Sequence, residues 1–483
     1  MEEYVKKAED LLQKVFTNTL WRQSQCINLI PSENTPSVFV KFLEISDPAG
    51  RYAEHKKAMK RERKLLAESR ALKDDQIFYY QGTDFIHFVE QKVNEEFGKY
   101  IGATEVESRP VSGQQANEVV FKAMVKFLNR TPDHAMCSQT GRMTCVMNNE
   151  LTYGGHLSAQ PFGALFNMVE GDSVVNFPLN KDNHYLLDAD EMCRLIEEHK
   201  PPLIVFGKSM FLHPEPVAQA RKCVDDLGLN TVIMYDAAHV MGILGPFFQD
   251  PLKEGVDVIT GSTHKTFFGP QRGIIAANMD RKSPLRKLWL DINSRAFPGS
   301  LSNHHLGTLT AMLMACLEMN AFRPAYQKAV VDNAKAFAQS LADFGIPVEG
   351  GKDRQYTSSH QVVIKVSDFG DGKEIAALLE DNNIITNYQA LPDDESFINP
   401  SGIRLGVSEM TRFGMDKQAF HTVAGFMADV IKDKKPVKDA VKTFRKDYLD
   451  MRYTFAKDRF TGMLRSIMEA VLPYKKDFSA IFS

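Results

Sequence analysis

The chain has 483 residues, a length typical of about two to four domain-sized units. Its 58 lysines and arginines against 61 acidic residues give a net charge of −3, which argues against a protein that coats nucleic acid. Hydrophobic residues make up 43% and charged residues 25%, as in globular rather than disordered proteins. No apolar run is long enough to span a bilayer, so we expect no membrane partner.

The first 16 residues predict an amphipathic helix and lack the uninterrupted apolar stretch of a signal peptide. Six cysteines lie scattered through the chain without a C-x-x-C pair: Cys26, Cys137, Cys145, Cys193, Cys223 and Cys316. This pattern favours a reduced protein without a structural zinc site, and we expect it to be cytoplasmic.

Short apolar runs in the middle of the chain predict four buried strands, at 202–206, 231–236, 256–260 and 273–277. A helical stretch at 215–227, closed by Gly228, separates the first two. Strands that alternate with helices indicate an α/β fold with a mostly parallel sheet and helices on both faces. Ligands gather at the carboxyl ends of such strands. The polar residues at those ends are Ser209, Asp236, His239, His264 and Lys265.

The pattern changes from about residue 333, where helices and a more alternating strand at 360–367 indicate a smaller α+β domain. A charged segment with a proline, 432–438, predicts a linker, and the aromatic-rich end predicts a packed helical extension. We therefore expect an N-terminal helical arm at 1–50, a large domain at 51–330, a small domain at 331–433 and a C-terminal helical extension at 434–483.

Two residues at strand ends suggest pyridoxal chemistry. Lys265 follows a predicted buried strand, and desolvation there would lower the pKa of its amine and make it a nucleophile for imine formation. Asp236 ends the preceding strand and could pair with a protonated pyridine nitrogen. Alone, Lys265 could equally be a surface lysine and Asp236 a helix cap. Together they are more specific, because they end consecutive strands of one sheet.

Three further motifs could serve a ligand. The segment SGQQAN at 112–117 opens a predicted helix and could present backbone N–H groups to a phosphate, although an ordinary helix cap is the default. Gly154 and Gly155 allow a tight bend before His156, which by itself says little. Arg404 stands between small and apolar neighbours and is suited to bind a carboxylate, or equally to form a structural ion pair.

Taken in order, these segments resemble serine hydroxymethyltransferase, a family of aspartate-aminotransferase-like (fold type I) enzymes that use pyridoxal 5′-phosphate. The matching segments run from about residue 28 to about residue 415. They are LIPSEN at 29–34, YAE at 52–54, YY at 79–80, SGQQAN at 112–117, GGHL at 154–157, DAAH at 236–239, THKT at 263–266 and GIRLG at 402–406.

The resemblance implies a role for each matching residue that would bind the cofactor. Lys265, next to His264, would form the Schiff base. The other cofactor contacts would be Asp236 at the pyridine nitrogen with His239 beside it, His156 stacked on the ring, Ser209 at the 3′ oxygen, and Ser112, Gly113 and Gln114 at the phosphate.

The resemblance also implies how substrates are bound. Ser32 and Arg404 would bind the amino-acid carboxylate. Tyr52 and Glu54 would reach in from a second subunit, with Glu54 handling a proton, so a homodimer with shared sites is expected. Tyr80 falls where the family places the pterin of tetrahydrofolate, the possible cosubstrate.

The chain departs from the family pattern at several positions. Phe268 stands where the family has an arginine, and Ala159 replaces a second histidine. Ser302 and Asn303 replace a phosphate-facing Gly-Gly pair, a charged insertion occupies 55–76, and helices from about 438 extend beyond the family's usual end. These changes affect the expected folate side more than the pyridoxal side.

We therefore expect an enzyme of the serine hydroxymethyltransferase type that makes or breaks the Cα–Cβ bond of serine or glycine-type amino acids. A folate-independent aldolase, a transaldolase or an aminotransferase on the same scaffold is the alternative. A catalytically inactive binding protein is a third hypothesis, and retention of Lys265, Asp236, His156 and Arg404 argues against it.

Overall fold

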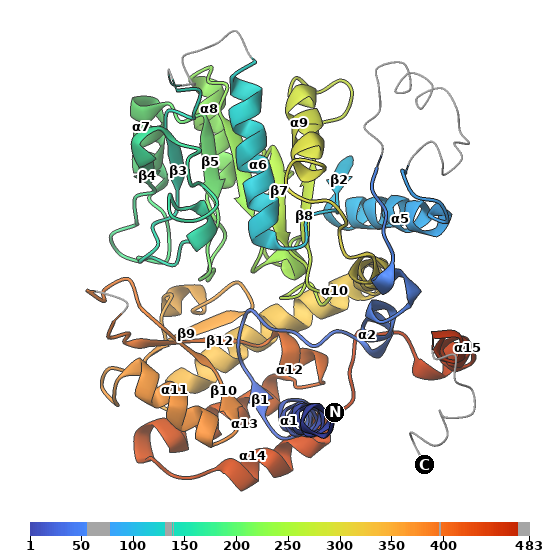
Figure 1. The fold of residues 1–483 in the computed structure, drawn as a ribbon. Helices are drawn as coiled ribbons and strands as arrows, with labels where there is room; N and C mark the ends of the chain where they lie inside the picture. Colours follow the sequence, from blue (N-terminus) through green and yellow to red (C-terminus); the bar gives the residue numbers. More distant parts are fainter. Residues whose placement is uncertain (56–77, 131–137, 139, 396–397, 472–483) are drawn as a thin grey trace.

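The computed structural model describes residues 1–55, 78–130, 138, 140–395 and 398–471 (Figure 1). Of the expected insertion at 55–76, all but His55 lies outside these residues, and so do 472–483. The described chain forms a large part around one sheet and a smaller part below it in Figure 1.

The large part contains a seven-stranded sheet, which confirms the predicted mostly parallel α/β architecture. Five neighbouring strands are parallel. At one edge β8 runs antiparallel to them, and β2 pairs antiparallel with β8 and so runs in the same direction as the five. Their order is β2 (Glu105–Glu107), β8 (Gly273–Ala277), β7 (Val258–Ser262), β6 (Val232–Asp236), β5 (Leu203–Phe206), β3 (Val146–Asn148) and β4 (Val174–Asn176). The four predicted strands correspond to β5, β6, β7 and β8.

The central strands read as continuous apolar runs because helices cover both faces of the sheet. Leu203 and Val205 pack in one cluster with α6 (Gly113–Leu128) and α9 (Arg286–Ala296). The alternate residues Ile204 and Phe206 pack on the other face, in a cluster with α7 (Ala189–His199) and α8 (Val217–Asp226). The predicted helix at 215–227 corresponds to α8, and Gly228 follows it with a positive φ of 63°.

The smaller part is built on an antiparallel sheet of β11 (Asn387–Gln389), β12 (Gly402–Gly406) and β9 (Gln361–Lys365), with helices α11 (Gly372–Asp381), α12 (Ser408–Arg412) and α13 (Lys417–Asp433). The predicted strand at 360–367 corresponds to β9, but four of its five residues are buried, so the alternation does not mark an exposed face. The long helix α10 (Leu306–Asp343) runs along both parts, and residue 330 lies within it (Figure 1).

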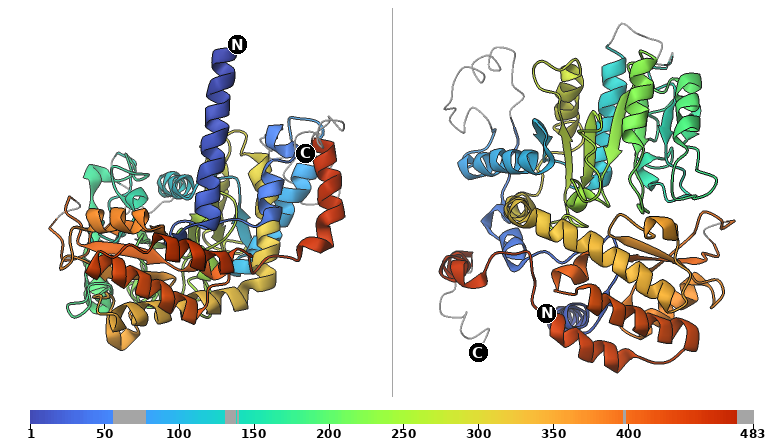
Figure 2. Two further views of the ribbon diagram at one scale, coloured as in Figure 1. Left: turned by 90° about the horizontal axis from the view of Figure 1, so that it is seen from below. Right: turned by 180° about the vertical axis from the view of Figure 1, so that it is seen from behind.

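The N-terminal segment joins the two parts. Helix α1 (Glu2–Ser24) buries none of its residues and projects from the body (Figure 2). Strand β1 (Ile27–Asn28) then pairs with β10 (Ile384–Ile385) of the smaller part, and α2 (Val38–Glu44) packs on α10. Helix α5 (Asp84–Ile101) also packs on α10.

The C-terminal extension is only partly packed. A non-helical segment, 434–437, separates α13 from α14 (Lys438–Arg445); it is shorter than the predicted linker at 432–438, whose end residues belong to the two helices. In α14, Val441 is fully buried, and Arg445 donates to the carbonyls of Cys26 and Gln23 at 3.0 Å each. Helix α15 (Thr461–Val471) is more exposed, with Met463 66% accessible.

A disulfide links two neighbouring helices of the large part. Cys193 of α7 and Cys223 of α8 form a disulfide with a Cα–Cα distance of 5.8 Å, so the prediction of fully reduced cysteines is wrong for this pair. The sequence could not reveal it, because the two residues meet only when the helices pack side by side.

Within the described ranges, no helix combines the length and apolar character needed to cross a membrane.

Candidate active site

Lys265 lies in the loop that follows β7, at the carboxyl edge of the large sheet. The loop folds back on itself, because the N–H of Gly269 donates to the carbonyl of Thr263 at 2.7 Å. The amide of Asn34 donates to the carbonyl of Lys265 at 2.9 Å. Burial lowers the pKa of the Lys265 amine to about 8; Asp236 opposes this shift and Arg404 reinforces it. A larger fraction of the amine is therefore uncharged near neutral pH than for an ordinary lysine, and the uncharged form is the nucleophile.

Asp236 ends β6 as a buried carboxylate in a fixed position. The Asn117 amide donates to its Oδ2 at 2.7 Å, and the N–H of Ala238 donates to its Oδ1 at 3.0 Å. Asn117 is itself oriented by the Thr260 hydroxyl, which donates to Asn117 Oδ1 at 2.5 Å.

The same amide of Asn117 connects Asp236 to His156. Its Nδ2 also donates to Ser158 Oγ at 2.6 Å, and this hydroxyl lies 2.6 Å from His156 Nδ1. The backbone N–H of Ser158 donates to the same ring nitrogen at 3.2 Å, so Nδ1 is an acceptor. Asn117 belongs to the SGQQAN motif, but nothing in the sequence pointed to its partner Ser158, 41 residues away.

The N-terminus of α6 lies against the end of β7. Ser112 caps this helix, with its Oγ accepting from the N–H of Gln115 at 3.1 Å. A Cβ on Gly113 would clash with Ser262 Oγ, so a larger residue there would require the Ser262 side chain to move. Gln114 is exposed. The first N–H groups of a helix have no partner within it, so the motif places unpaired donors close to the Lys265 loop.

Arg404 comes from the smaller part, in the middle of β12. Its Nη1 donates to the carbonyl of Ser209 at 2.6 Å, and its Nε lies 3.4 Å from Asn387 Oδ1. Ser209 is held in turn, because its N–H donates to the carbonyl of Gly154 at 2.7 Å. Burial lowers the pKa of the Arg404 guanidinium to about 10. Within the described residues, no carboxylate forms an ion pair with this buried cation.

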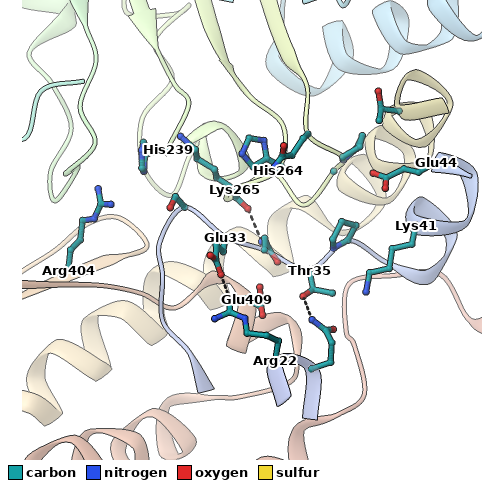
Figure 3. Close-up of a pocket in the computed structure, with 18 residues that line it drawn as sticks. Arg22, Glu33, Thr35, Lys41, Glu44, His239, His264, Lys265, Arg404 and Glu409 are labelled. Carbon is teal, nitrogen blue, oxygen red and sulfur yellow. Dashed lines mark hydrogen bonds and ion pairs between the residues drawn. The ribbon is translucent and has the colours of Figure 1, made fainter. Parts of the chain in front are cut away.

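A cavity of about 970 Å³ brings the two sheets' functional residues together (Figure 3). Lys265 reaches it from the large sheet and Arg404 from the small one. Its inner wall also contains Ser32, His239 and His264, and its outer wall contains Arg22, Lys41 and Glu44.

Three histidines near the two cations are held uncharged. The pKa of His239 lies well below its usual range because of burial, with Lys265 and Arg404 adding to the shift. Burial lowers the pKa of His264 to about 4 and that of His360 to about 3. The sequence did not single out His360, which lies 3.3 Å from the Pro31 carbonyl. In the described chain, Nδ1 of both His239 and His264 is buried without a hydrogen-bond partner.

Tyr52, Glu54 and Tyr80 lie together but do not line this cavity. The rings of Tyr52 and Tyr80 are 4.9 Å apart, and Tyr52 Oη is 3.4 Å from Glu54 Oε1. Tyr52 is 43% exposed and Tyr80 40% exposed. Within one chain they therefore form a separate, solvent-facing group.

Phe268 does not lie where the sequence comparison suggested. It is fully buried in the core, with the Arg412 guanidinium 4.0 Å from its ring centroid and the Tyr326 ring 5.0 Å away. The residues that line the cavity do not include Phe268, and its effect on folate binding stays a prediction.

The chain is similar to known proteins over most of its length. The family model for serine hydroxymethyltransferase matches residues 76–427. Serine hydroxymethyltransferase from Pyrobaculum arsenaticum is 38% identical over 457 residues, which cover 94% of this chain and 96% of that protein. The protein of the same name from Archaeoglobus fulgidus is 37% identical and covered over 89% of both chains.

A solved structure shares the fold. The L-threonine transaldolase from Pseudomonas fluorescens, in its internal aldimine state, superposes with a TM-score of 0.77 over 98% of both chains at 24% identity. At this identity the structural similarity shows the fold alone, whereas the family model and the sequence identities above show the family. The chain belongs to the serine hydroxymethyltransferase family, and it is a pyridoxal-phosphate-dependent enzyme of the hydroxymethyltransferase or aldolase type.

Proposed function

We propose that Lys265, Asp236, His156 and the start of α6 hold the pyridoxal phosphate. The residues fit this group: Lys265 offers a buried amine with a lowered pKa, and Asp236 offers a carboxylate held by two N–H donors. The unpaired N–H groups at the α6 N-terminus suit the phosphate. The partnerless Nδ1 of His239 is a further polar atom available to a ligand.

When bound, pyridoxal phosphate supplies an electron sink for the electrons released at the substrate Cα. Asp236 would accept a hydrogen bond from the protonated pyridine nitrogen and keep it charged. Asn117 and Ser158 hold Asp236 and His156 in one hydrogen-bonded chain, so the carboxylate and the ring that would stack on the cofactor keep a fixed relation.

We propose that Arg404 and Ser32 bind the carboxylate of a small amino acid. The observation that carries this proposal is that Lys265 and the buried Arg404 face one cavity from two sheets. A buried guanidinium without a carboxylate in the described chain is costly unless a ligand provides one. Arg404 would thereby orient the substrate and determine which Cα bond aligns with the cofactor.

This role of Arg404 can be tested with two variants. Arg404→Ala should lose affinity for glycine and serine while keeping the cofactor's absorption band, and Arg404→Lys should be intermediate because lysine lacks the bidentate geometry. Amino acids that bind Arg404→Ala as tightly as the wild-type enzyme would make Arg404 a structural residue.

We further propose a homodimer in which Tyr52, Glu54 and Tyr80 complete the neighbouring subunit's site. Two observations support this: these residues do not line their own chain's cavity, and α1 exposes a stripe that includes Leu12 and Phe16. In the shared site, Glu54 would hold or accept a proton at the β-hydroxyl of the substrate.

Mixed dimers test the shared site directly. Lys265→Ala and Glu54→Gln chains should each be inactive alone. A dimer of one of each should recover activity, because one of its two sites then has both wild-type residues. Mixed dimers as inactive as the parents would refute the shared site.

We propose that serine and glycine are the substrates and that tetrahydrofolate carries the one-carbon unit, in a cytoplasmic enzyme. The burial of Phe268 supports folate use, because this departure leaves the cavity unobstructed. The cavity also continues from Lys265 to Lys41 and Arg22, beyond the space that a small amino acid needs.

The folate proposal is tested by measuring glycine formation from serine with and without tetrahydrofolate. We expect serine cleavage to require the folate. Folate-independent cleavage of threonine-type substrates, or aldehyde exchange between amino acids, with no response of serine cleavage to folate would assign the enzyme to the aldolase or transaldolase type.

A further inference from the structure

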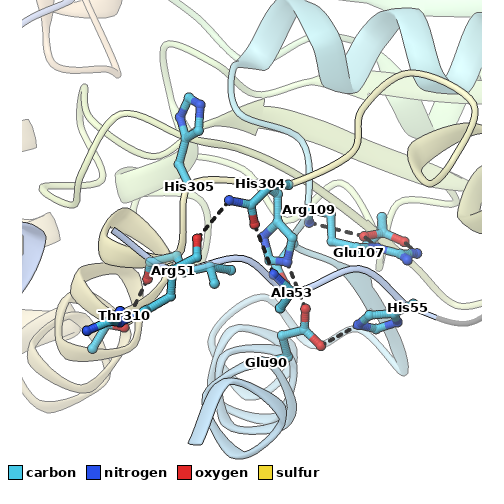
Figure 4. Close-up of polar contacts among 12 residues, drawn as sticks. Arg51, Ala53, His55, Glu90, Glu107, Arg109, His304, His305 and Thr310 are labelled. Atoms are coloured by element: carbon cyan, nitrogen blue, oxygen red, sulfur yellow. Dashed lines mark hydrogen bonds and ion pairs between the residues drawn. The ribbon is translucent and has the colours of Figure 1, made fainter. Parts of the chain in front are cut away.

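A buried carboxylate, Glu90 of α5, connects two histidines that lie far apart in the sequence (Figure 4). Its Oε2 lies 2.7 Å from His55 Nε2, and its Oε1 lies 2.8 Å from His304 Nε2. Burial would raise the pKa of Glu90, but the two histidines outweigh it and hold the pKa well below its ordinary value. Glu90 is therefore ionised, although it is only 6% exposed.

His304 links Glu90 to a second buried charge. Its Nδ1 accepts from Arg272 Nη2 at 3.1 Å, so its proton is on Nε2 and points to Glu90. Burial lowers the pKa of His304, which leaves the ring neutral between an anion and a cation. Arg272 also donates to the carbonyls of His304 at 2.6 Å and His305 at 3.0 Å. The loop that ends at His305 is thus tied down at several points.

His55, the other histidine that contacts Glu90, fixes the segment that contains Tyr52 and Glu54. His55 directly follows Glu54 and forms a β-bridge with Phe78, while the Glu54 carbonyl accepts from the N–H of Tyr79 at 3.0 Å. Glu90 thus binds this segment one residue away from Glu54.

Asn303 connects the loop that contains His304 with the segment that contains His55, so the two segments that contact Glu90 are also bonded to each other. Its Oδ1 accepts from the N–H of Ala53 at 3.3 Å, and its Nδ2 donates to the carbonyl of Arg51 at 2.9 Å. The arm, defined here as residues 51–55, is therefore held by Glu90 through His55 (Figure 4) and by Asn303 through the backbone of Ala53 and Arg51.

The buried charged network around Glu90 differs sharply in exposure from the side chains that it supports, and this difference suggests a functional role for the network. A buried charge network is weak evidence for stability, since apolar side chains of similar volume often stabilise as well or better. Here the buried network lies beneath two exposed side chains, Tyr52 and Tyr80, which do not line their own chain's cavity. Rigid support of exposed polar groups is what a site completed by another molecule needs.

We propose that Glu90 is a positioning residue that fixes the arm so that Glu54 enters the neighbouring subunit's site in its working orientation. The inference rests on the proposed dimer with shared sites. It predicts that the loss of Glu90 harms the active site of the opposite subunit, and not the site of the chain that carries the change.

Two mixed dimers, isolated with two different affinity tags, test this placement. In the first, one chain carries Lys265→Ala and the other carries Glu90→Gln, so the working Lys265 receives an intact arm. In the second, one chain carries both changes and the other is wild type, so the working Lys265 receives the altered arm. We expect the first to match a Lys265→Ala/wild-type dimer, and the second to lose kcat about ten- to a hundredfold with little change in KM.

Controls separate positioning from general destabilisation. Glu95→Gln changes a glutamate on the same helix whose side chain is 60% exposed, and it should have no effect in either arrangement. His55→Ala breaks the contact between the arm and Glu90 and leaves the contact between Glu90 and His304 in place, so it should reproduce the trans effect if Glu90→Gln fails to fold. In the cofactor-free dimer, amide hydrogen exchange in 51–55 should rise with Glu90→Gln or His55→Ala and not with Glu95→Gln.

The outcomes distinguish this inference from the proposed function. If Lys265→Ala and Glu54→Gln chains do not complement each other, the shared site is wrong and this inference fails with it. If they complement each other and both Glu90→Gln arrangements are equally active or equally impaired, only the positioning role of Glu90 is overturned.

Discussion

At the scale of single residues, the site is defined by how its charges are balanced. Lys265 is affected by burial and Arg404, which lower the pKa of its amine, and by Asp236, which raises it. His239 and His360 stay neutral beside these cations. The site therefore adds no further positive charge next to the lysine that must become uncharged to react.

This balance predicts how cofactor uptake depends on pH. A lysine reacts with the cofactor's aldehyde only when it has lost its proton. The rate of pyridoxal phosphate incorporation into cofactor-free enzyme should therefore rise with pH up to about 8 and then level off. Arg404→Ala should move this midpoint upward, because Arg404 lowers the pKa of Lys265. Stopped-flow absorbance would check both, and a wild-type midpoint near 10.5 would contradict the first.

Asn117 allows a second prediction at this scale. Replacing it with alanine removes one buried hydrogen-bond partner from each of Asp236, Ser158 and Thr260. We expect Asn117→Ala to lower the free energy of unfolding by about 1–3 kcal/mol and to weaken cofactor binding. Denaturant unfolding and cofactor titration would measure these effects, with the exposed Asn18→Ala of α1 as the control. Equal values for the two variants would show that the hydrogen-bonded chain contributes nothing.

At the scale of elements, the site is built where strands and helices end. Asp236 ends β6 and Lys265 follows the adjacent parallel strand β7, and the N-terminus of α6 approaches the same edge at Gly113. Regular hydrogen bonding stops at these ends, so the side chains and backbone groups there are available to a ligand.

The disulfide between α7 and α8 permits a prediction about these two helices. It joins cysteines 30 residues apart, and closing a loop of this length should stabilise the folded state by about 3–4 kcal/mol. Cys193→Ser/Cys223→Ser should therefore unfold at lower denaturant concentration than the oxidised enzyme. A reductant should bring the wild type to the same value and leave the double variant unchanged. Identical unfolding of oxidised wild type and variant would contradict the prediction.

At the scale of the whole molecule, helix α1 leaves apolar side chains exposed in a single chain. It has no buried residue, while Leu12 is 67% exposed and Phe16 is 62% exposed. These two side chains lie four residues apart and so share one face of the helix. A second chain that covered this face would remove apolar surface from water and stabilise the assembly.

Polar substitutions on α1 test this role. Leu12→Gln/Phe16→Gln should shift the protein from dimer toward monomer, since burying each side chain contributes about 1.5–3 kcal/mol. Activity should fall with dimer content if the sites are shared. Sedimentation velocity over a dilution series would follow the change, and Lys14→Gln/Asn18→Gln on the same helix would be the control. An unchanged dimer affinity would place the interface elsewhere.

The sequence by itself determined the features that depend on local pattern and chain order. Continuous apolar runs predicted β5, β6, β7 and β8, and polar residues after them predicted the edge where Asp236 and Lys265 lie. The order of short motifs predicted the family, which the comparisons confirm. These signals are local because strand burial and turn chemistry leave their pattern within a few residues.

Only the tertiary structure decided which distant residues touch. Ser158 meets Asn117, Cys193 meets Cys223, and Glu90 bridges His55 and His304 across 35 and 214 residues. Phe268 turned toward the core although its position in the motif suggested the pocket. Contacts of this kind depend on how helices pack on sheets, and packing brings residues together without leaving a periodic pattern in the sequence.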